Sequence, residues 1–404
     1  MNKKLFTYIV MVSLGAMAIV GCQPEIVEVV KEVAVEKIVE VEVYVPPGEP
    51  VLVGVNLALT GPGAINSVNI INGMKLAAEE VNNAGGVLGG RPIKIVAEDN
   101  KCIPSEGVSA QTKLVYQDKV SVTLGLACSS VVLAAMPIME EAQVPNIVSG
   151  ATNPQIWKLS GIGGNIWNFR TNPPDDVFAR IGSKILVESL GYKTFGGLVP
   201  ENDWGRGVID AYTESIGELG GEMVAVEFYS EETVDYVPIL TKFKDLGADT
   251  VILAASADPS IKILSAAKEI GYNIPWSGQA QYFTAQVYEA VGTEGLEDAT
   301  QVGAWYPIDT SPDSVAFVAA FQSAWGYEPP WPSLSGYVSM KVAADAIERA
   351  GSDEPAAIRD ALEETNLPSP FGPVQYDEYN QNHARVSMAQ MKGGELKVLV
   401  AEEW

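Results

Sequence analysis

Short apolar runs alternate with longer segments of helical periodicity from Val51 onward. Residues 51–59 form a near-continuous apolar run, which is typical of a strand buried on both faces of a parallel sheet. Residues 68–83 have helical spacing and end at Ala84-Gly85-Gly86, a signal for the end of a helix. The pattern therefore predicts strands and helices in alternation, as in an α/β fold.

The alternation continues as two successive series of similar length. In the first, strands are predicted at residues 93–98, 120–125 and 146–149, and helices at 105–117 and 130–143. The second follows Arg170-Thr171-Asn172-Pro173-Pro174, with helices at 177–190, 204–219, 237–246 and 259–270, and strands at 194–199, 222–228, 250–254 and 274–277. Beyond a run at 301–306, helices are predicted at 314–325, 335–350 and 355–364, and strands at 374–376, 386–391 and 396–400. Two such series predict two doubly wound parallel-sheet lobes.

The amino terminus has the pattern of a lipoprotein signal. Lys3 and Lys4 precede an apolar stretch from residue 5 to 20, which closes on Ile19-Val20-Gly21-Cys22. The stretch is short for a membrane span, which needs about 20 apolar residues. We expect residues 1–21 to be removed and Cys22 to become the lipidated first residue, outside the cytoplasm at a membrane surface. An uncleaved single-pass anchor and an unlipidated secretory signal are the alternatives.

Residues 22–50 differ in composition from the rest of the chain. Residues 26–45 consist almost entirely of Val, Glu, Lys, Ile and Ala, and Pro46-Pro47-Gly48 follows. We interpret this segment as a solvated tether, which would reach at most about 100 Å when fully extended. A short self-associating strand or a coiled coil is the alternative.

The charge balance excludes some partners. Lys and Arg number 26 against 51 Asp and Glu, a formal net charge of −25. Such a surface repels nucleic acid and anionic lipid headgroups, so no nucleic-acid partner is expected. No second apolar stretch is long enough to span a bilayer, so the expected membrane contact is the lipid alone.

A search for catalytic motifs finds no constellation that would make an enzyme. The single histidine, His383, lies in a polar carboxyl-terminal stretch, which is typical of a solvated loop. The sequence contains neither a P-loop nor a GxSxG nucleophile elbow. With one histidine and few cysteines, a zinc site is implausible. We therefore expect no catalytic residue, no metal and no cofactor.

Cys102 and Cys128 remain as a pair once Cys22 is assigned to the lipid. In an oxidising compartment an isolated pair tends to form a disulfide. Each cysteine follows a predicted strand end, and adjacent parallel strands would bring those ends together. Two buried free thiols are the alternative.

Polar residues follow two of the predicted strands, at the edge where open α/β sheets bind ligands. Ser129 and Ser130 come after the strand at 120–125, and Gly150 and Thr152 come after the strand at 146–149. A serine at a helix start can receive a carboxylate together with backbone N–H groups, and a glycine lets the backbone approach a ligand. Plain helix capping is the alternative for each serine.

The order and spacing of several short motifs resemble one known family. The chain looks like the leucine/isoleucine/valine-binding type of periplasmic binding protein (type I fold), which feeds ABC importers, over most of residues 51–400. The matching segments are Leu59-Thr60-Gly61-Pro62, Asn72-Gly73-Met74-Lys75-Leu76-Ala77, Val81-Asn82-Asn83-Ala84-Gly85-Gly86-Val87, Glu98-Asp99-Asn100-Lys101-Cys102, Cys128-Ser129-Ser130, Gly150-Ala151-Thr152-Asn153-Pro154, Phe169-Arg170-Thr171 and Asp203-Trp204-Gly205-Arg206-Gly207.

The resemblance implies two lobes that are joined by three crossovers and clamp one small ligand. We expect residues 51–168 plus 303–370 in lobe 1, and 169–302 plus 371–404 in lobe 2. It also implies that Cys102 and Cys128 are the disulfide of the family.

The resemblance further assigns ligand contacts. It implies that Ser129 and Thr152 hold the ligand carboxylate and that the Gly150 carbonyl receives the ammonium group. Trp204 matches the aromatic residue that closes over the ligand. Asn66 falls near another ligand-facing position, and Trp331 falls near an apolar one.

The chain departs from this family pattern in the second lobe. Amino-acid binders usually carry an acidic residue after the strand at 274–277, where this chain has Gly278-Gln279-Ala280-Gln281. Asp258 is a candidate replacement, because an unpaired buried ammonium is costly. Otherwise the ligand lacks an amino group, as an amide, a urea or an aromatic acid does. Trp204 and Trp331 indicate a flat or larger apolar ligand, unless they merely pack within the lobes.

The expected function is that of a lipid-anchored solute-binding component of an ABC importer, with a membrane permease as partner. A branched-chain or other neutral amino acid is the expected ligand, and the location is the cell surface or the periplasm. A ligand sensor of the same fold is one alternative. An extracellular hydrolase is another, which the missing nucleophile–base constellation disfavours.

The lipoprotein interpretation predicts that Cys22→Ala abolishes lipid labelling of the chain, because the thiol that carries the lipid is gone. Metabolic labelling with a fatty-acid analogue measures this directly. Unchanged labelling of the variant would contradict the assignment.

Overall fold

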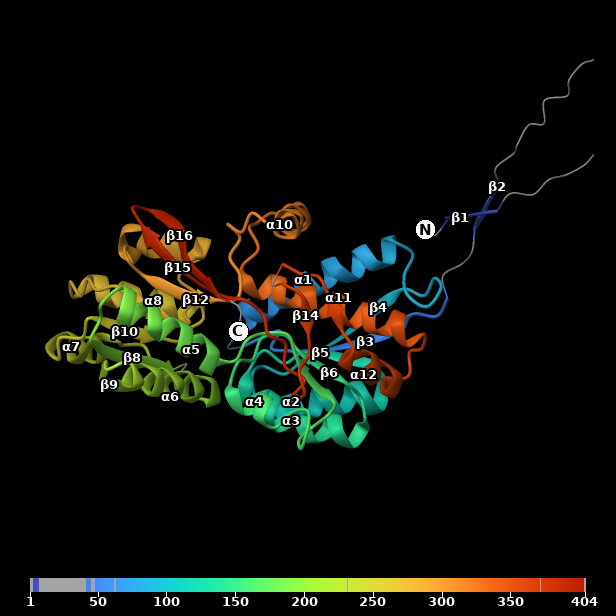
Figure 1. Ribbon diagram of the computed structural model, residues 1–404, viewed down its shortest axis with the longest axis horizontal. Coiled ribbons are helices and arrows are strands. Elements are labelled where there is room, and N and C mark those ends of the chain that lie inside the picture. Colours follow the sequence, from blue (N-terminus) through green and yellow to red (C-terminus); the bar gives the residue numbers. More distant parts are fainter. Residues whose placement is uncertain are drawn as a thin grey trace, which may run out of the picture.

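The computed structural model describes residues 3–6, 41–44, 48–61, 63–230, 232–370 and 372–402. Strands β1 (Lys3–Phe6) and β2 (Val41–Tyr44) pair antiparallel beyond the folded body (Figure 1). Cys22 and most of the proposed signal and tether lie outside the described residues, so those assignments stay predictions. None of the helices in the described ranges is long and apolar enough to cross a membrane.

The folded body consists of two lobes that lie side by side along the long axis of the molecule (Figure 1). Lobe 1 is built on a parallel sheet with the strand order β4-β3-β5-β6-β7. Its strands are β3 (Val51–Leu57), β4 (Ile93–Asp99), β5 (Val122–Gly125), β6 (Asn146–Val148) and β7 (Asn168–Arg170). Its helices are α1 (Ala64–Asn83), α2 (Pro104–Thr112), η1 (Lys113–Gln117), α3 (Ser129–Ala142), α4 (Pro154–Lys158), α10 (Pro312–Trp325), α11 (Trp331–Ala350) and α12 (Pro355–Glu363), and it also holds the pair β13 (Asn366–Leu367) and β14 (Val374–Gln375).

Lobe 2 repeats the arrangement with a four-stranded parallel sheet in the order β11-β10-β8-β9. Its strands are β8 (Thr194–Pro200), β9 (Glu222–Tyr229), β10 (Thr250–Leu253) and β11 (Trp276–Gly278). Its helices are α5 (Asp175–Lys184), η2 (Ile185–Ser189), α6 (Asp203–Glu218), α7 (Val237–Asp245), α8 (Ala257–Glu269), α9 (Ala285–Val291) and η3 (Glu294–Leu296). A second sheet of this lobe is antiparallel and contains β12 (Thr300–Gly303), β15 (Val386–Lys392) and β16 (Glu395–Glu402).

This architecture confirms the predicted α/β fold with two parallel-sheet lobes. The strands are buried as the apolar runs indicate: every residue of β5 and β10 is buried. The sequence analysis missed β7, α4 and α9, because each is too short to show a clear period.

The chain passes between the lobes after β7, after β12 and before β15. Residues 169–170 still pair with β6, and β14 pairs with β13, so both segments lie with lobe 1. The first and third passages therefore come a few residues later than the predicted boundaries at 168 and 370. The apolar pattern could not show this, because β7 and β14 owe their place to pairing with strands distant in sequence.

Cys102 and Cys128 are joined by a disulfide, with their Cα atoms 5.7 Å apart. The reason given from the sequence is wrong in one respect, because β4 and β5 are not neighbours and β3 lies between them. Cys128 directly precedes α3, and the turn that carries Cys102 beyond β4 reaches across the end of β3 to meet it.

Helices α1 and α11 approach each other through a pair of glycines. A Cβ atom at Gly336 would lie 2.0 Å from the carbonyl oxygen of Ile70, and one at Gly73 would lie 1.9 Å from that of Ser333. Neither position has room for a side chain. The core of lobe 1 therefore depends on the close contact of these two helices, although they are far apart in the sequence.

We predict that Gly336→Ala destabilises the protein by at least about 2 kcal/mol, because overpacking forces the two backbones apart. Urea unfolding of the disulfide-intact protein measures the change. Gly217→Ala is the matched control, since this exposed helical glycine has open space around it and should gain about 0.5–1 kcal/mol. Equal stability of the two variants would contradict the packing argument.

Candidate ligand-binding site

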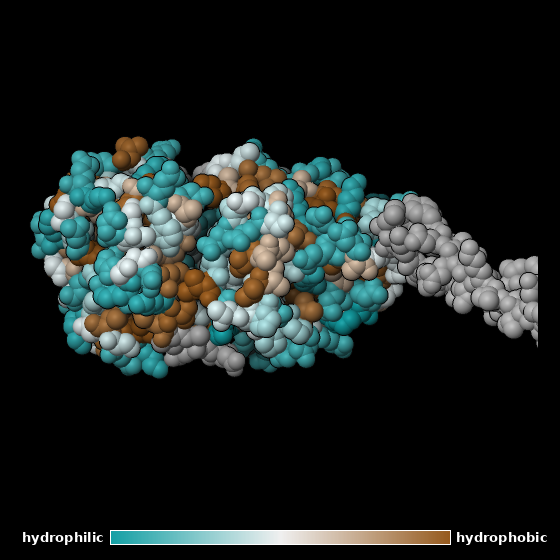
Figure 2. Space-filling view, turned by 90° about the horizontal axis from the view of Figure 1, so that it is seen from above, coloured by the Kyte–Doolittle hydropathy of each residue, from teal (hydrophilic) through white to brown (hydrophobic). Residues whose placement is uncertain are grey.

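A cavity of about 310 Å³ lies between the two lobes. Its volume is at the lower end of the range that holds small molecules. Seen from above, hydrophilic residues cover most of the surface, and hydrophobic ones gather beside the junction of the lobes (Figure 2). Both lobes contribute lining residues, so a molecule in the cavity would contact both.

Lobe 1 contributes the polar residues that follow β5 and β6. Ser129, Gly150 and Thr152 line the cavity, and both hydroxyl residues are buried. The Ser129 hydroxyl accepts a hydrogen bond from the backbone N–H of Asn153 at 3.4 Å. A Cβ atom at Gly150 would lie 2.9 Å from the Cα of Ala127, so only glycine fits there. The amino terminus of α3 adds a positive partial charge, which favours an anionic group.

Lobe 2 contributes Trp204 from the first turn of α6 and Gln279 from the end of β11. Asn202 caps α6 by accepting a hydrogen bond from the N–H of Gly205 at 3.0 Å. The Gln279 Nε2 atom is buried, and the side chain interacts with the nearby carboxyl group of Asp175.

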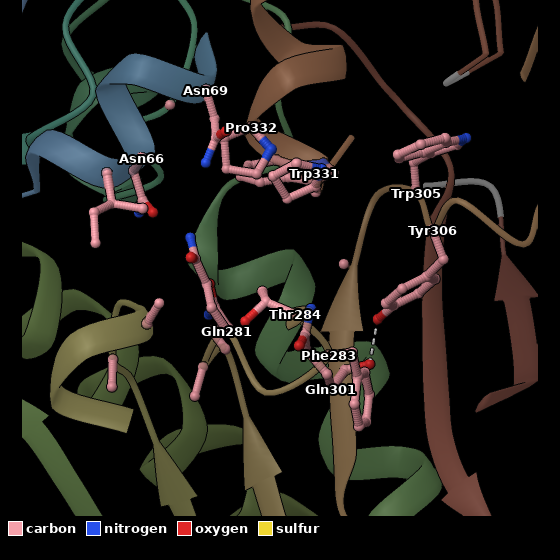
Figure 3. Close-up of a pocket in the computed structure, with 18 of the residues that line it drawn as sticks. Asn66, Asn69, Gln281, Phe283, Thr284, Gln301, Trp305, Tyr306, Trp331 and Pro332 are labelled. Atoms are coloured by element: carbon pink, nitrogen blue, oxygen red, sulfur yellow. Dashed lines mark hydrogen bonds between the residues drawn. The ribbon is translucent and has the colours of Figure 1, made fainter. Parts of the chain in front are cut away.

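Aromatic and amide side chains make up part of the cavity lining (Figure 3). Asn66 and Asn69 of α1 and Trp331 of α11 lie on one side, across from Gln281 of lobe 2. The Tyr306 hydroxyl donates a hydrogen bond to the Gln301 carbonyl. The aromatic residues of the lining are Phe178, Trp204, Phe283, Tyr288, Trp305, Tyr306, Tyr327 and Trp331.

The cavity thus brings together seven of the residues singled out from the sequence. They are Asn66, Ser129, Gly150, Thr152, Trp204, Gln279 and Trp331. Their ligand contacts remain predictions.

Two of the singled-out residues do not reach the cavity. Ser130 is not among the lining residues, although its neighbour Ser129 is. The side chain of Asp258 is 61% exposed and forms an ion pair with Lys262 at 2.8 Å. Asp258 is the second residue of α8 and pairs along that helix with the residue four positions on, so it faces solvent. It does not replace the missing acid.

His383 lies within 2.8 Å of Asp377 and is not among the lining residues. Among the described residues there is no group of three or more His, Cys, Asp or Glu side chains that could hold a metal.

The sequence analysis missed a buried acid, Asp175. Its side chain is fully buried, and it is the only buried carboxylate among the described residues. Its backbone N–H donates to the carbonyl oxygen of Thr152 at 2.8 Å. Burial raises the pKa of Asp175 to about 7, although the nearby Thr152, Arg170 and Gln279 lower it. Asp175 opens a helix directly after two prolines, which in the sequence resembles an ordinary acid in a first helical turn.

The raised pKa of Asp175 predicts a pH-dependent stability. The unfolded chain has its ordinary pKa of 3.8, so between about pH 4 and pH 7 the folded state holds the extra proton and loses stability as pH rises. Asp175→Asn removes this loss. The free energy of unfolding of the variant, relative to that of the wild type, should therefore rise by a few kcal/mol from about pH 4 to pH 8. Urea unfolding at both pH values measures it.

Asp258→Asn serves as the control, because an exposed ion pair changes stability by at most about 1 kcal/mol at either pH. A stability difference between Asp175→Asn and wild type that stays constant with pH would contradict the assignment.

Comparison with known proteins agrees with this architecture. The model of a family described as periplasmic binding protein matches residues 50–395. The chain is 28% identical over 360 residues to an amino acid binding protein of Pseudomonas aeruginosa, which covers 88% of this chain and 90% of that protein. It is 26% identical over 331 residues to Leu/Ile/Val-binding protein homolog 1 of Brucella suis, and the match covers 81% of this chain and 86% of that protein.

Solved structures with the same fold include two ligand complexes. The branched-chain amino acid transporter substrate-binding protein LivJ of Streptococcus pneumoniae, in complex with isoleucine, has a TM-score of 0.79 at 26% identity and covers 88% of this chain and 99% of its own. A solute-binding protein of an ABC transporter from R. palustris, in complex with benzoate, has a TM-score of 0.79 at 21% identity. The match covers 87% of this chain and 96% of that protein. Together with the match over nearly all of the folded body, the two-lobe architecture shows that this chain belongs to the periplasmic binding protein family.

Proposed function

We propose that the protein is the extracytoplasmic substrate-binding component of an ABC importer. It binds a small neutral amino acid between its lobes and delivers it to a membrane permease. Branched-chain amino acids are the first candidates for this ligand. The family membership supports the class of function. The similarity to a Leu/Ile/Val-binding protein homolog and to a branched-chain amino acid transporter protein solved with isoleucine supports the ligand. We assign the protein no catalytic role.

The observation that carries this proposal is that both lobes line one cavity. Thr152 and Ser129 come from lobe 1, and Trp204 and Gln279 come from lobe 2. A ligand therefore gains its full set of contacts only when the lobes are together, which couples binding to closure. The permease can then distinguish loaded from empty protein by its shape.

The lining residues suit a molecule with one carboxylate and an apolar side chain. Among the described residues no Lys or Arg lines the cavity, so the hydroxyls of Ser129 and Thr152 and the start of α3 are the groups that can receive the carboxylate. The Gly150 carbonyl would accept from an ammonium group. Trp204 and Trp331 would cover an apolar side chain.

We place the protein outside the cytoplasm, in the periplasm or at the cell surface. A lipid on Cys22 would anchor it, and residues 22–50 would act as the tether. This arrangement would hold the lobes near the permease while leaving them room to close.

An aromatic acid is a second candidate ligand. Phe283, Tyr306 and Trp331 are among the aromatic side chains that line the cavity, and such a lining also suits an aromatic ring. A protein of the same fold from R. palustris has been solved with benzoate.

Thermal unfolding of the soluble body against a ligand panel tests the proposal. Leucine, isoleucine or valine at about a hundred times its dissociation constant should add about 2.7 kcal/mol, and thus raise the Tm by several degrees. The panel includes benzoate, hydroxybenzoates, amides and urea. A rise in Tm with aromatic acids alone would show that the ligand is an aromatic acid and not an amino acid. No rise in Tm with any compound of the panel would contradict both candidate ligands.

Two neighbouring serines give a matched test of the carboxylate contact. Ser129→Ala should weaken leucine binding at least about tenfold, because a hydrogen bond to a charged group contributes about 1.5–3 kcal/mol. Ser130→Ala should leave affinity within about twofold, because that side chain does not line the cavity. Isothermal titration calorimetry measures both. Equal losses for the two variants would contradict the assignment.

A further inference from the structure

Asn153 joins the two lobes beside the cavity. Its residue is only 6% exposed, and it lies between the cavity-lining Thr152 and the start of α4 in lobe 1. Its side-chain Nδ2 donates to the backbone carbonyl oxygen of Asp203, the first residue of α6 in lobe 2, at 2.5 Å. The next residue, Trp204, lines the cavity from lobe 2. One amide group therefore connects the two segments that carry Thr152 and Trp204.

The other polar groups of Asn153 are bonded within lobe 1 and at the first passage. The side-chain Oδ1 accepts from the N–H of Gln155 at 2.8 Å and so caps α4. The backbone carbonyl oxygen accepts from Arg170 Nη1 at 3.1 Å. The backbone N–H donates to the Ser129 hydroxyl oxygen at 3.4 Å, so that hydroxyl can donate its own proton to a ligand. These bonds hold Asn153 firmly in lobe 1, and its Nδ2 reaches across to lobe 2.

Helix α6 has a glycine where the Asn153 amide lies against it. A Cβ atom at Gly207 would lie 2.7 Å from Asn153 Nδ2 and 3.3 Å from Pro154 Cδ. Real Cβ atoms essentially never come as close to another atom as the first of these distances. A side chain at Gly207 would therefore push the amide away from the Asp203 carbonyl oxygen. The glycine of lobe 2 and the amide of lobe 1 are thus complementary across the boundary between the lobes.

We propose that Asn153 and Gly207 form a contact between the lobes that stabilises their closed, ligand-bound arrangement. Asn153 is then a positioning residue, which sets Trp204 across the cavity from Thr152. This inference rests on the proposed function, because it requires a ligand that closes the lobes. The Asn153 side chain does not itself line the cavity. It therefore raises affinity without touching the ligand, and by the same factor for every ligand that closes the lobes.

Asn153→Ser separates the contact between the lobes from the cap of α4. Serine caps a helix about as well as asparagine, but its shorter side chain does not reach the Asp203 carbonyl oxygen. The variant should bind leucine about two- to tenfold more weakly, because the closed form loses one hydrogen bond. Stopped-flow kinetics should show this loss as faster dissociation with unchanged association. A purely structural role would instead lower the urea midpoint of the ligand-free protein and leave both rates unchanged.

Gly207→Ala alters the same contact from lobe 2. It should weaken leucine binding at least about fivefold, because overpacking opposes closure. The ligand-free protein should become no less stable, since alanine favours a helix over glycine. Gly217→Ala in the same helix is the matched control, because open space surrounds it, and it should leave leucine affinity unchanged. The double variant Asn153→Ser/Gly207→Ala should bind leucine no more weakly than Gly207→Ala, because serine leaves room for the alanine, whereas independent effects would multiply.

Isothermal titration calorimetry with leucine, valine and benzoate completes the test. For each compound that binds the wild type, a given variant should lose the same factor in affinity, within about twofold. Wild-type leucine affinity of either single variant, or multiplied losses in the double variant, would overturn the inference and leave the proposed function intact. If the wild type binds benzoate but neither amino acid, the amino-acid ligand is wrong, and the same variants test the contact with benzoate. Binding of none of these compounds to the wild type would contradict both the inference and the proposed function.

Discussion

The buried polar contacts at the passages between the lobes determine where the cavity and its lining residues lie. The Gln381 side chain accepts from the Arg170 guanidinium and donates to the carbonyl oxygens of Asn172 and Asn382 at 2.8 and 2.7 Å. These bonds join the first and third passages, which are more than 200 residues apart in the chain. Because unpaired polar groups would be costly there, the two passages are held side by side in one arrangement. Thr152, which lines the cavity, is then held to the start of α5 by the backbone hydrogen bond from the N–H of Asp175 to its carbonyl oxygen.

The hinge and the binding site therefore share residues. Asn153 lies next to Thr152 and donates to the carbonyl oxygen of Asp203 at 2.5 Å, one residue before Trp204. A change in the angle between the lobes must alter these contacts and the cavity together. This is the physical reason why one small ligand can stabilise a closed form of a much larger protein.

Much of the fold and several of the residues that line the cavity could be predicted from the sequence. Strands such as β5 and β10 are buried and apolar throughout, so their pattern is unambiguous. Residues next to strand ends, such as Ser129 and Thr152, could be placed because the carboxyl ends of parallel strands share one edge of a sheet. The direction of a side chain on a helix could not be read in the same way, and for this reason Asp258 was placed wrongly.

Other features depend on contacts between segments distant in sequence. Asp175 is fully buried, and no local pattern in the sequence distinguishes it from its half-buried neighbour Asp176 in the same helical turn. The strand β7 exists through its pairing with β6, and the disulfide links turns on either side of an intervening strand. In each case the chain must fold before the feature exists.

We propose that one small amino acid binds between the lobes and closes them. A crystal structure of the soluble body with leucine tests it most directly, supported by small-angle scattering with and without leucine. We expect leucine to contact Thr152 of lobe 1 and Trp204 of lobe 2, and to reduce the radius of gyration in solution. Leucine bound to one lobe alone, or bound with no change in the radius of gyration, would contradict it.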